Sequence, residues 1–153
     1  MRIRELMSPN VKSCTEDADL ATVAKIMWDG DCGIVPVVND ERHVTGVITD
    51  RDICIAAATR STAPASLRAR DVMSRDLSTC AEDADVRDAL ATLKNRRVRR
   101  LPVVDDEDRL VGILSMNDLA ARAECRRGAE VPGEEFLDVM KAICAHAAAV
   151  AAV

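Results

Sequence analysis

The chain has 153 residues, of which 48% are apolar and 31% charged, the balance of a globular protein with a sizeable core. Its net charge of -5 and its two aromatic residues, Trp28 and Phe136, argue against nucleic acid as the main partner, because such binding needs a basic surface or a platform for stacked bases. The first residues lack the apolar run of a signal peptide, and residues 142–153 are too few to cross a bilayer. We therefore expect a cytoplasmic protein with no membrane contact.

The chain contains an internal repeat. Shifting the sequence by 66 residues aligns 7–53 with 73–119 without a gap, and 14 of the 47 aligned positions are identical. The shared residues are grouped as Met-Ser at 7–8 and 73–74, Glu-Asp-Ala-Asp at 16–19 and 82–85, and Pro-Val-Val at 36–38 and 102–104. Such agreement at a fixed spacing indicates a duplication.

The first copy predicts five elements in chain order. A short extended segment, Val11–Cys14, is followed by a helix that begins after Asp19, a residue whose carboxylate can accept from free amides of the first turn. Its apolar residues have helical spacing: Leu20, Val23, Ala24 and Met27. Two β-branched runs then predict strands at Ile34–Val38 and Val44–Thr49, and a second helix is expected over Asp50–Thr59.

The second copy predicts the same order. The extended segment is Leu77–Cys80, Asp85 is the expected N-cap, and the helix has its apolar residues at Val86, Ala89, Leu90 and Leu93. Strands are expected at Leu101–Val104 and Leu110–Ser115, and a second helix at Met116–Glu124.

These elements predict an α/β (α+β) fold. It consists of two β-α-β-β-α repeats packed sheet to sheet as one module, because a unit of this size buries too little surface alone. The expected boundaries are 1–60 for the first repeat, 61–70 for a linker, 71–124 for the second repeat and 125–153 for a helical tail. The tail is expected to have one apolar stripe of Phe136, Leu137, Met140, Ile143, Cys144 and Ala147.

The six cysteines form no metal motif in the sequence. No two are spaced as C-x-x-C, and His43 and His146 have no ligand-like spacing with them, so no metal site is expected. In a cytosolic protein most of these cysteines are expected to be small buried apolar residues.

Two segments with the same pattern follow the second strand of each copy. GVITDRD (46–52) and GILSMND (112–118) place a hydroxyl residue where a strand ends and a helix begins. A helix start offers free amides and a partial positive charge to an anion, and a carboxylate three residues later can bind ribose hydroxyls. The same spacing is also that of a capping box, so a purely structural role is the alternative.

The two copies resemble CBS (cystathionine β-synthase) domains in the tandem arrangement called a CBS pair or Bateman module. The resemblance lies in the twice-repeated order of M-S, D-A-D, P-V-V and G-h-h-[ST]-x-x-D, where h is apolar, and in overall length it is to stand-alone bacterial members. It implies a regulatory ligand-binding module in which Thr49 and Ser115 face phosphate and Asp52 and Asp118 hold ribose. The implied ligand contains adenosine: AMP, ADP, ATP or S-adenosylmethionine.

A basic run, Lys94 to Arg100, precedes the second Pro-Val-Val. Its first basic residues are those of an ordinary solvated helix end, where the dipole favours cations. In the family, basic residues at the positions of Arg99 and Arg100 contact phosphates, for which the guanidinium fork is suited. The first copy has Gly33 and Ile34 there, so the second copy is expected to form the phosphate-binding site.

The resemblance also implies that the base lies between the copies. Val11 and Ser13 would enclose the base of the site formed by Arg99, Arg100, Leu101, Ser115 and Asp118. Leu77 and Thr79 would enclose that of the site formed by Ile34, Val35, Thr49 and Asp52.

No enzyme motif is present in the sequence, so no catalytic activity or catalytic cofactor is expected. The family resemblance implies a homodimer formed through helices that include Trp28, Ile53 and Leu119, with an unknown regulated protein as a further partner. Two alternatives remain: a dimerisation or protein-interaction platform without a ligand, and a redox or metal sensor that uses Cys14 and Cys80 with Cys32, Cys54, Cys125 or Cys144.

Overall fold

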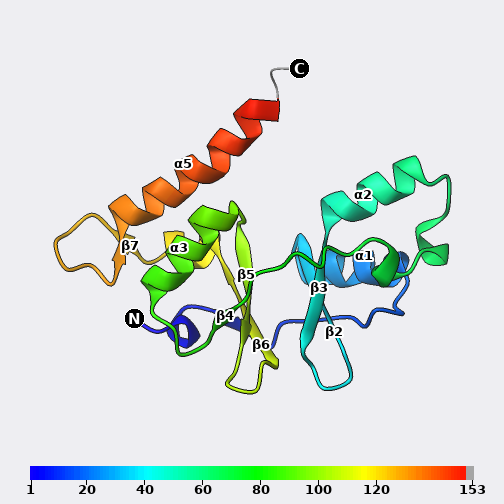
Figure 1. Cartoon of the computed structure of the whole chain (residues 1–153), viewed down its shortest axis with the longest axis horizontal. Helices are drawn as coiled ribbons and strands as arrows, with labels where there is room; N and C mark the ends of the chain where they lie inside the picture. Colours follow the sequence, from blue (N-terminus) through cyan, green and yellow to red (C-terminus); the bar gives the residue numbers. More distant parts are fainter. Residues whose placement is uncertain (151–153) are drawn as a thin grey trace. The chain divides into compact units, whose positions relative to one another are not determined.

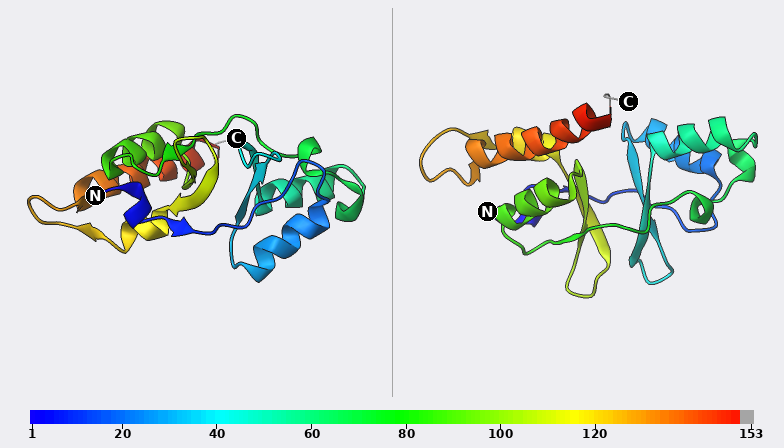
Figure 2. Two further views of the ribbon diagram at one scale, coloured as in Figure 1. Left: turned by 90° about the horizontal axis from the view of Figure 1, so that it is seen from below. Right: turned by 45° about the horizontal axis from the view of Figure 1, so that its top comes forward.

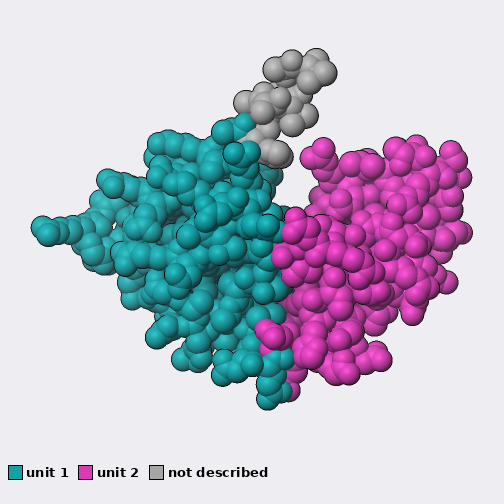
Figure 3. Space-filling view, viewed as in Figure 1, with its two compact units in different colours: residues 1–11, 78–107, 111–153 teal, residues 12–77, 108–110 magenta. Residues whose placement is uncertain are grey.

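The computed structural model describes residues 1–150, and side chains as far as residue 145. The chain forms two compact units, coloured separately in Figure 3. Unit 1 contains residues 1–11, 78–107 and 111–153, whereas unit 2 contains residues 12–77 and 108–110. The units interleave in sequence. Residues 1–11 belong to the unit that contains the second repeat, and the residues between the repeats, up to residue 77, belong to the unit that contains the first.

Unit 2 contains the first repeat. Helix α1 (Leu20–Asp29) is followed by strands β2 (Ile34–Val38) and β3 (Val44–Thr49), which pair antiparallel, and by helix α2 (Asp50–Thr59). The predicted N-cap is confirmed, since Asp19 accepts from the Thr22 amide at 2.9 Å and from its hydroxyl at 2.8 Å. These bonds, led by the Thr22 amide, lower the pKa of Asp19. The unit ends with the short helices η2 (Pro64–Ser66) and η3 (Ala69–Asp71).

Unit 1 contains the second repeat, with β4 (Cys80–Ala81), α3 (Val86–Arg96), β5 (Arg100–Val104), β6 (Leu110–Ser115) and α4 (Met116–Ala120). Asp85 caps α3 by accepting from the Arg87 amide at 3.0 Å, as predicted. At the start of the chain, η1 (Ile3–Glu5) and β1 (Ser8–Pro9) complete this unit, and β1 gives a sheet with the order β1-β6-β5-β4 (Figure 1).

The segment that precedes each repeat binds to the other repeat. Ile3 and Arg4 donate their amides to Ala84 and Glu82 at 3.1 and 2.9 Å. The equivalent Ala69 and Arg70 donate to Ala18 and Glu16 at 2.8 and 3.0 Å. Ion pairs repeat the arrangement, since Arg4–Asp83 and Arg70–Asp17 are both 2.7 Å long. Each repeat is therefore completed by a segment from the other half of the chain.

The shared glycines make this exchange possible. A Cβ on Gly112 would lie 2.6 Å from Met7 Sδ, and one on Gly46 would lie 2.8 Å from Met73 Sδ. A side chain at either position would push the incoming methionine out. The close approach explains why glycine and methionine recur together in both copies.

Each unit has its own apolar core. In unit 2, Leu20, Val23, Val35, Val37 and Ile48 are fully buried. In unit 1, the core contains Ile3 together with residues of α3, β5, β6 and α4. Among the described residues, no helix is both long and apolar enough to cross a membrane.

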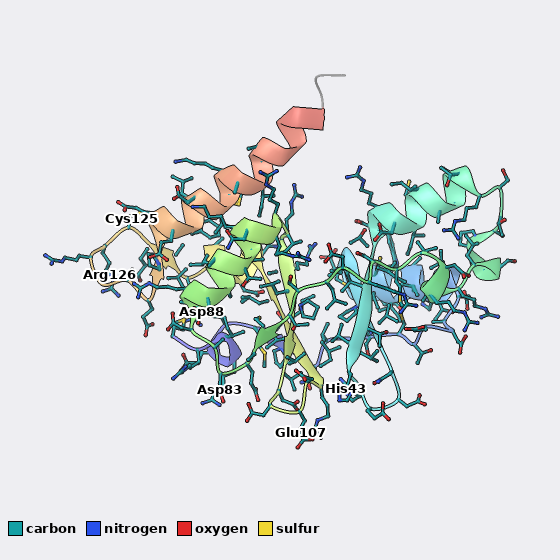
Figure 4. All side chains as sticks on the ribbon, in the orientation of Figure 1. His43, Asp83, Asp88, Glu107, Cys125 and Arg126 are labelled. Carbon is teal, nitrogen blue, oxygen red and sulfur yellow. The ribbon has the colours of Figure 1, made fainter. Side chains whose placement is uncertain are left out.

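The tail forms helix α5 (Gly133–Val150), which lies alongside α3 (Figures 1 and 2). A short parallel pair, β7 (Ala123–Glu124) with β8 (Val131–Pro132), precedes it, and Figure 4 shows Cys125 and Arg126 on the intervening loop. The prediction of a single stripe is wrong: Val139 and Ile143 are buried with Phe136 against them, whereas Leu137, Met140 and Cys144 are exposed. The side chain of Ala147 lies outside the described residues.

Four other elements differ from the prediction in their bounds. Helix α4 ends at Ala120, because residues 123–124 pair as β7 with β8 instead of continuing the helix. Of the predicted segment Val11–Cys14, Cys14 alone is bridged to a strand, at Val37, and Leu77–Cys80 reduces to the start of β4. Strand β5 begins one residue early, at Arg100.

Candidate functional site

Both helix starts that carry the repeated Gly-to-Asp motif have the same geometry. At α2, Asp52 Oδ2 accepts from the Thr49 amide and hydroxyl at 2.8 and 2.7 Å, while the Asp52 amide donates to Thr49 Oγ1 at 3.2 Å. At α4, Asp118 Oδ2 accepts from the Ser115 amide and hydroxyl at 2.7 and 2.6 Å, and the Asp118 amide donates to Ser115 Oγ at 3.3 Å. The structural capping role is therefore present in both copies.

Capping leaves part of each aspartate free. The bonds of Asp52 and Asp118 all use Oδ2, and in the part of the chain that the structure describes neither Oδ1 accepts a hydrogen bond. A carboxylate oxygen accepts from hydroxyl donors, so this geometry allows capping and ribose binding by the same side chain. The hydroxyls of Thr49 and Ser115, by contrast, already donate to the aspartates and would have to turn toward a phosphate.

The two copies differ in the first turn of the helix. In α2, the Asp50 carboxylate accepts from the Arg51 amide at 2.8 Å, so the protein's own anion occupies this amide. In α4, Met116 replaces Asp50, and the equivalent amide of Asn117 has no hydrogen-bond partner among residues 1–150. The free amide and the absence of a second carboxylate favour anion binding at α4 over α2.

The residues that precede β2 and β5 reinforce this difference. The amide of Met116 donates to the Arg99 carbonyl at 3.0 Å, and the amide of Asp50 donates to that of Gly33 at 3.3 Å, so these positions are equivalent. A Cβ on Gly33 would lie 3.1 Å from Asp50 Oδ2. The first copy therefore has Gly33 with the Asp50 carboxylate beside it, whereas the second copy has Arg99 in place of the glycine and Met116 in place of the carboxylate.

Arg99 and Arg100 differ from the start of the basic run. Lys94 lies 3.4 Å from Asp138 of α5, as expected for a solvated helix end. Arg99 is exposed and Arg100 half-buried, and within the described residues neither side chain has an ion pair or hydrogen bond. Their charges remain available to a ligand.

The residues expected around the base divide between the units. Val11 belongs to unit 1 with Ser115 and Asp118, and Leu77 to unit 2 with Thr49 and Asp52. Ser13 lies in unit 2 and Thr79 in unit 1, so each belongs to a different unit from the other residues of its expected site. Val35 and Leu101 are completely buried and Ile34 is nearly so, whereas Val11, Ser13 and Leu77 are partly exposed and Thr79 is exposed.

Unit 2 has a cavity that the sequence did not predict. Its volume is about 500 Å³, and it lies between the end of α1 and the start of α2. The lining consists of Ala24, Met27, Trp28, Asp31, Cys32, Gly33, Asp50, Ile53 and Cys54. Helical spacing alone could not show it, since the same apolar residues also indicate a helix that packs on its own core.

The cysteines are less buried than predicted. Cys14 is buried, Cys32 and Cys80 are half-buried, and Cys54, Cys125 and Cys144 are exposed, because these three lie on helix surfaces and a loop. Burial raises the pKa of both Cys14 and Cys80 to about 11, which keeps these thiols protonated and poorly reactive. Within the described residues, no three His, Cys, Asp or Glu side chains form a group that could hold a metal ion.

Comparison with protein families identifies the fold. The CBS domain model matches residues 3–58 and 69–124, which together make up most of the chain. The chain belongs to the CBS-domain family. It is a CBS pair, a module associated with regulation, and its helices and sheets match those of solved CBS pairs.

Several solved CBS pairs are similar to this one. CBS protein TA0289 from Thermoplasma acidophilum has 25% identity and a TM-score of 0.76 over 93% of this chain and 75% of its own. Hypoxic Response Protein I, solved with two coordinated zinc ions, has 28% identity and a TM-score of 0.72 over 79% and 98%. The CBS pair of MJ0100, in complex with 5'-methylthioadenosine and S-adenosyl-L-methionine, has 24% identity and a TM-score of 0.71, which shows the shared fold.

Curated relatives include short and long proteins. Uncharacterized protein MK0525 of Methanopyrus kandleri is 36% identical over 97 residues, and this CBS pair spans 50% of its length. Inosine-5'-monophosphate dehydrogenase of Methanocaldococcus jannaschii is 30% identical over 118 residues, or 23% of that enzyme. Hypoxic response protein 1 of Mycobacterium tuberculosis is 28% identical over 141 residues, which is 92% of both chains.

Proposed function

We propose that this CBS pair is a non-catalytic regulatory module that binds an adenosine-containing ligand and changes its conformation or its affinity for a partner in response. The observation that supports the proposal is the helix start at α4. It combines a free Asp118 oxygen, a free Asn117 amide and the unpaired side chains of Arg99 and Arg100. These are groups that bind ribose hydroxyls and phosphate.

The ligand of the α4 site is proposed to be AMP, ADP or ATP, because the arginines provide charge-assisted donors for phosphate. The base would lie against aliphatic residues of the same unit, Val11 and Leu101. The α2 site, with Thr49, Asp52, Ile34, Val35 and Leu77, would take an adenosine moiety whose 5' group is not an anion, since Asp50 already fills the anion position. S-adenosylmethionine, one of the two compounds in the MJ0100 complex, has such a group.

The proposed assembly is a homodimer formed through helices. Trp28 on α1 is 86% exposed, and an exposed indole of this size is typical of an interface. Ile53 is half-buried beside it. Leu119, the equivalent residue expected at the interface, is completely buried in the core of unit 1 and is not part of it.

A thermal-shift titration with AMP, adenosine and S-adenosylmethionine tests the proposed function. A ligand present at 100 times its dissociation constant is expected to raise the free energy of unfolding by about 2.7 kcal/mol. The variant Arg127→Ala, which removes an exposed arginine of the loop between β7 and β8, is the control and should respond as the wild type does. No shift with any of these three compounds, nor with ADP or ATP, would overturn the proposal and favour a dimerisation platform without a ligand.

A further inference from the structure

The two repeats differ in what covers their first helix. In unit 2 the cavity between α1 and α2 is open, and Trp28 in its lining is 86% exposed. We call this cavity, with Trp28, Cys32, Ile53 and Cys54 in its lining, the repeat-1 groove.

The equivalent surface of repeat 2 is covered. A shift of 66 residues maps Ala24, Met27, Asp50 and Ile53 onto Leu90, Leu93, Met116 and Leu119. These four residues are at most 8% exposed, and they form one apolar cluster with Val139 and Ile143 of α5. The chain itself thus shows that this surface of a repeat accepts an amphipathic helix.

Helix α5 has a second apolar surface that no described residue covers. Leu137 is 52% and Met140 37% exposed, and Cys144 is exposed as well. Spacings of three and four residues place them on one side of the helix, which we call the outer stripe of α5. The buried residues Val139 and Ile143 lie on a different side, against unit 1.

The groove and the outer stripe also carry charges of opposite sign. Asp31 and Asp50 line the repeat-1 groove, and neither has an ion pair in the part of the chain that the structure describes. Lys141 follows Leu137 by four residues and therefore flanks the outer stripe; it lies 3.9 Å from Asp138 and is 68% exposed, so its charge can also reach a partner. The acidic residues Glu135 and Asp138 are instead directed to α3, where they lie 3.4 Å from Arg87 and Lys94.

We propose that the outer stripe of α5 of one copy fills the repeat-1 groove of a second copy. A two-fold axis forms the contact twice, so that each subunit gives one helix and receives one, and both apolar surfaces are covered. The inference rests on the homodimer included in the proposed function and specifies its interface. In this interface α5 packs between two CBS repeats: its inner side contacts repeat 2 of its own subunit, and its outer stripe contacts repeat 1 of the partner.

Two sets of substitutions test the two surfaces separately. Leu137→Glu/Met140→Glu places charges on the outer stripe, and Trp28→Glu places one at the groove; all three side chains are exposed in the single subunit, so each variant should fold. Each is expected to raise the dimer dissociation constant at least about 30-fold in sedimentation velocity, since a central tryptophan or leucine contact is worth that much. Ala145→Glu, an exposed α5 residue outside the stripe, is the matched control and should leave the constant unchanged.

Mixing the two variants decides which surfaces meet. The stripe variant keeps an intact groove and the groove variant keeps an intact stripe, so their heterodimer regains one native contact that neither homodimer has. The mixture is therefore expected to contain dimers at concentrations where each variant alone is monomeric. If the wild type is dimeric and one variant alone stays dimeric, stripe meets stripe or groove meets groove. If both variants are monomeric and the mixture stays monomeric as well, the two surfaces do not meet each other. Either result makes our inference wrong while the dimer stands. A wild type that stays monomeric at concentrations up to about the millimolar range would overturn both this inference and the proposed homodimer.

Discussion

At the scale of single residues, the two repeats keep the same capping geometry at the helix start and differ in the charge beside it. Thr49 with Asp52 and Ser115 with Asp118 form the same set of hydrogen bonds, within about 0.1 Å of each other. The first turn of α2 has Asp50 in addition, whereas in α4 the Asn117 amide has no partner within residues 1–150, and Arg99 and Arg100 lie before and at the first residue of β5. A duplicated module can therefore offer two sites with different charge preferences.

The arginines give the first prediction. Arg99→Ala/Arg100→Ala should weaken AMP binding more than adenosine binding, because the variant loses phosphate donors and keeps Asp118. Calorimetry with both ligands is expected to show a loss of about 1.5–3 kcal/mol per charged hydrogen bond for AMP and a small change for adenosine. The AMP loss should shrink at high salt, which screens the charges. Equal losses for the two ligands would assign the arginines to the shape of the pocket.

Thiol reactivity gives the second prediction. At pH 8, iodoacetamide should modify Cys54, Cys125 and Cys144 first, as measured by mass spectrometry, because they are exposed. Cys14 and Cys80 should react only as the pH approaches about 11, since burial raises their pKa and the thiolate is the nucleophile.

The raised pKa values of Cys14 and Cys80 also make the stability of the fold depend on pH. Each of these two thiols binds its proton more tightly in the folded state than at its ordinary pKa of 9.0. The contribution of these two thiols to the free energy of unfolding should therefore be constant below pH 9 and fall as the pH rises toward 11. Fast modification of Cys14 at pH 8 would contradict the buried position.

At the scale of elements, the sequence predicted the helices with an acidic cap and the strands between them. Asp19 and Asp85 precede apolar residues of helical spacing, and the structure has α1 and α3 at those positions. The β-branched runs became β2, β3, β5 and β6 within one residue of the predicted bounds. These elements are specified by neighbouring residues, and local sequence is sufficient for them.

Elements that depend on tertiary contacts were not predictable in this way. Residues 121–124 have helical propensity, but β7 forms there because β8, which comes after a loop, pairs with it. The α5 stripe was misplaced because the helix is apolar over a broad arc, and only contact with α3 decides which part is buried. For the site, spacing predicted Thr49, Asp52, Ser115 and Asp118 as partners, but the role of Asp50 required its contact with the Arg51 amide.

Helix α5 gives the third prediction. Ile143→Ala should lower the free energy of unfolding by about 2–5 kcal/mol, the cost of a cavity in a core, because Ile143 is 8% exposed and lies in the unit 1 cluster. Leu137→Ala, on the exposed side, should change it by less than about 0.5 kcal/mol. Urea unfolding at a protein concentration low enough for monomers measures both. A large loss for Leu137→Ala would mean that α5 is rotated from its position here.

At the scale of the whole molecule, neither repeat is complete by itself. Leu67, Ala69 and Met73 are buried in the core of unit 2, although they follow the first repeat in sequence. Ile3 and Leu6 are buried in the core of unit 1, although they precede the first repeat. The halves of the chain exchange these segments, so the stability of each unit depends on both halves.

This exchange gives the fourth prediction. A fragment of residues 1–60 should be unfolded alone, because it lacks the three buried residues from 67–73 and its own first residues have no partner. Coexpression with residues 61–153 should restore a folded complex that copurifies and has the helical circular dichroism of the intact chain. A control fragment extended to residue 77 should gain structure without the second half. A folded 1–60 fragment would contradict the exchange.

The exchange also affects the order in which the segments fold during synthesis. The amides of Ile3 and Arg4 bind carbonyls of residues 84 and 82, and β1 pairs with β6 at Gly112 and Ile113. At about 5–20 residues per second, a ribosome needs roughly 5–20 s to make the stretch between β1 and β6. During that time Ile3 and Leu6 have no core to enter, because the other residues of their cluster come from the second repeat and the tail. Residues 3–9 are thus made well before the strand with which β1 pairs, and they are among the last parts of the module to fold.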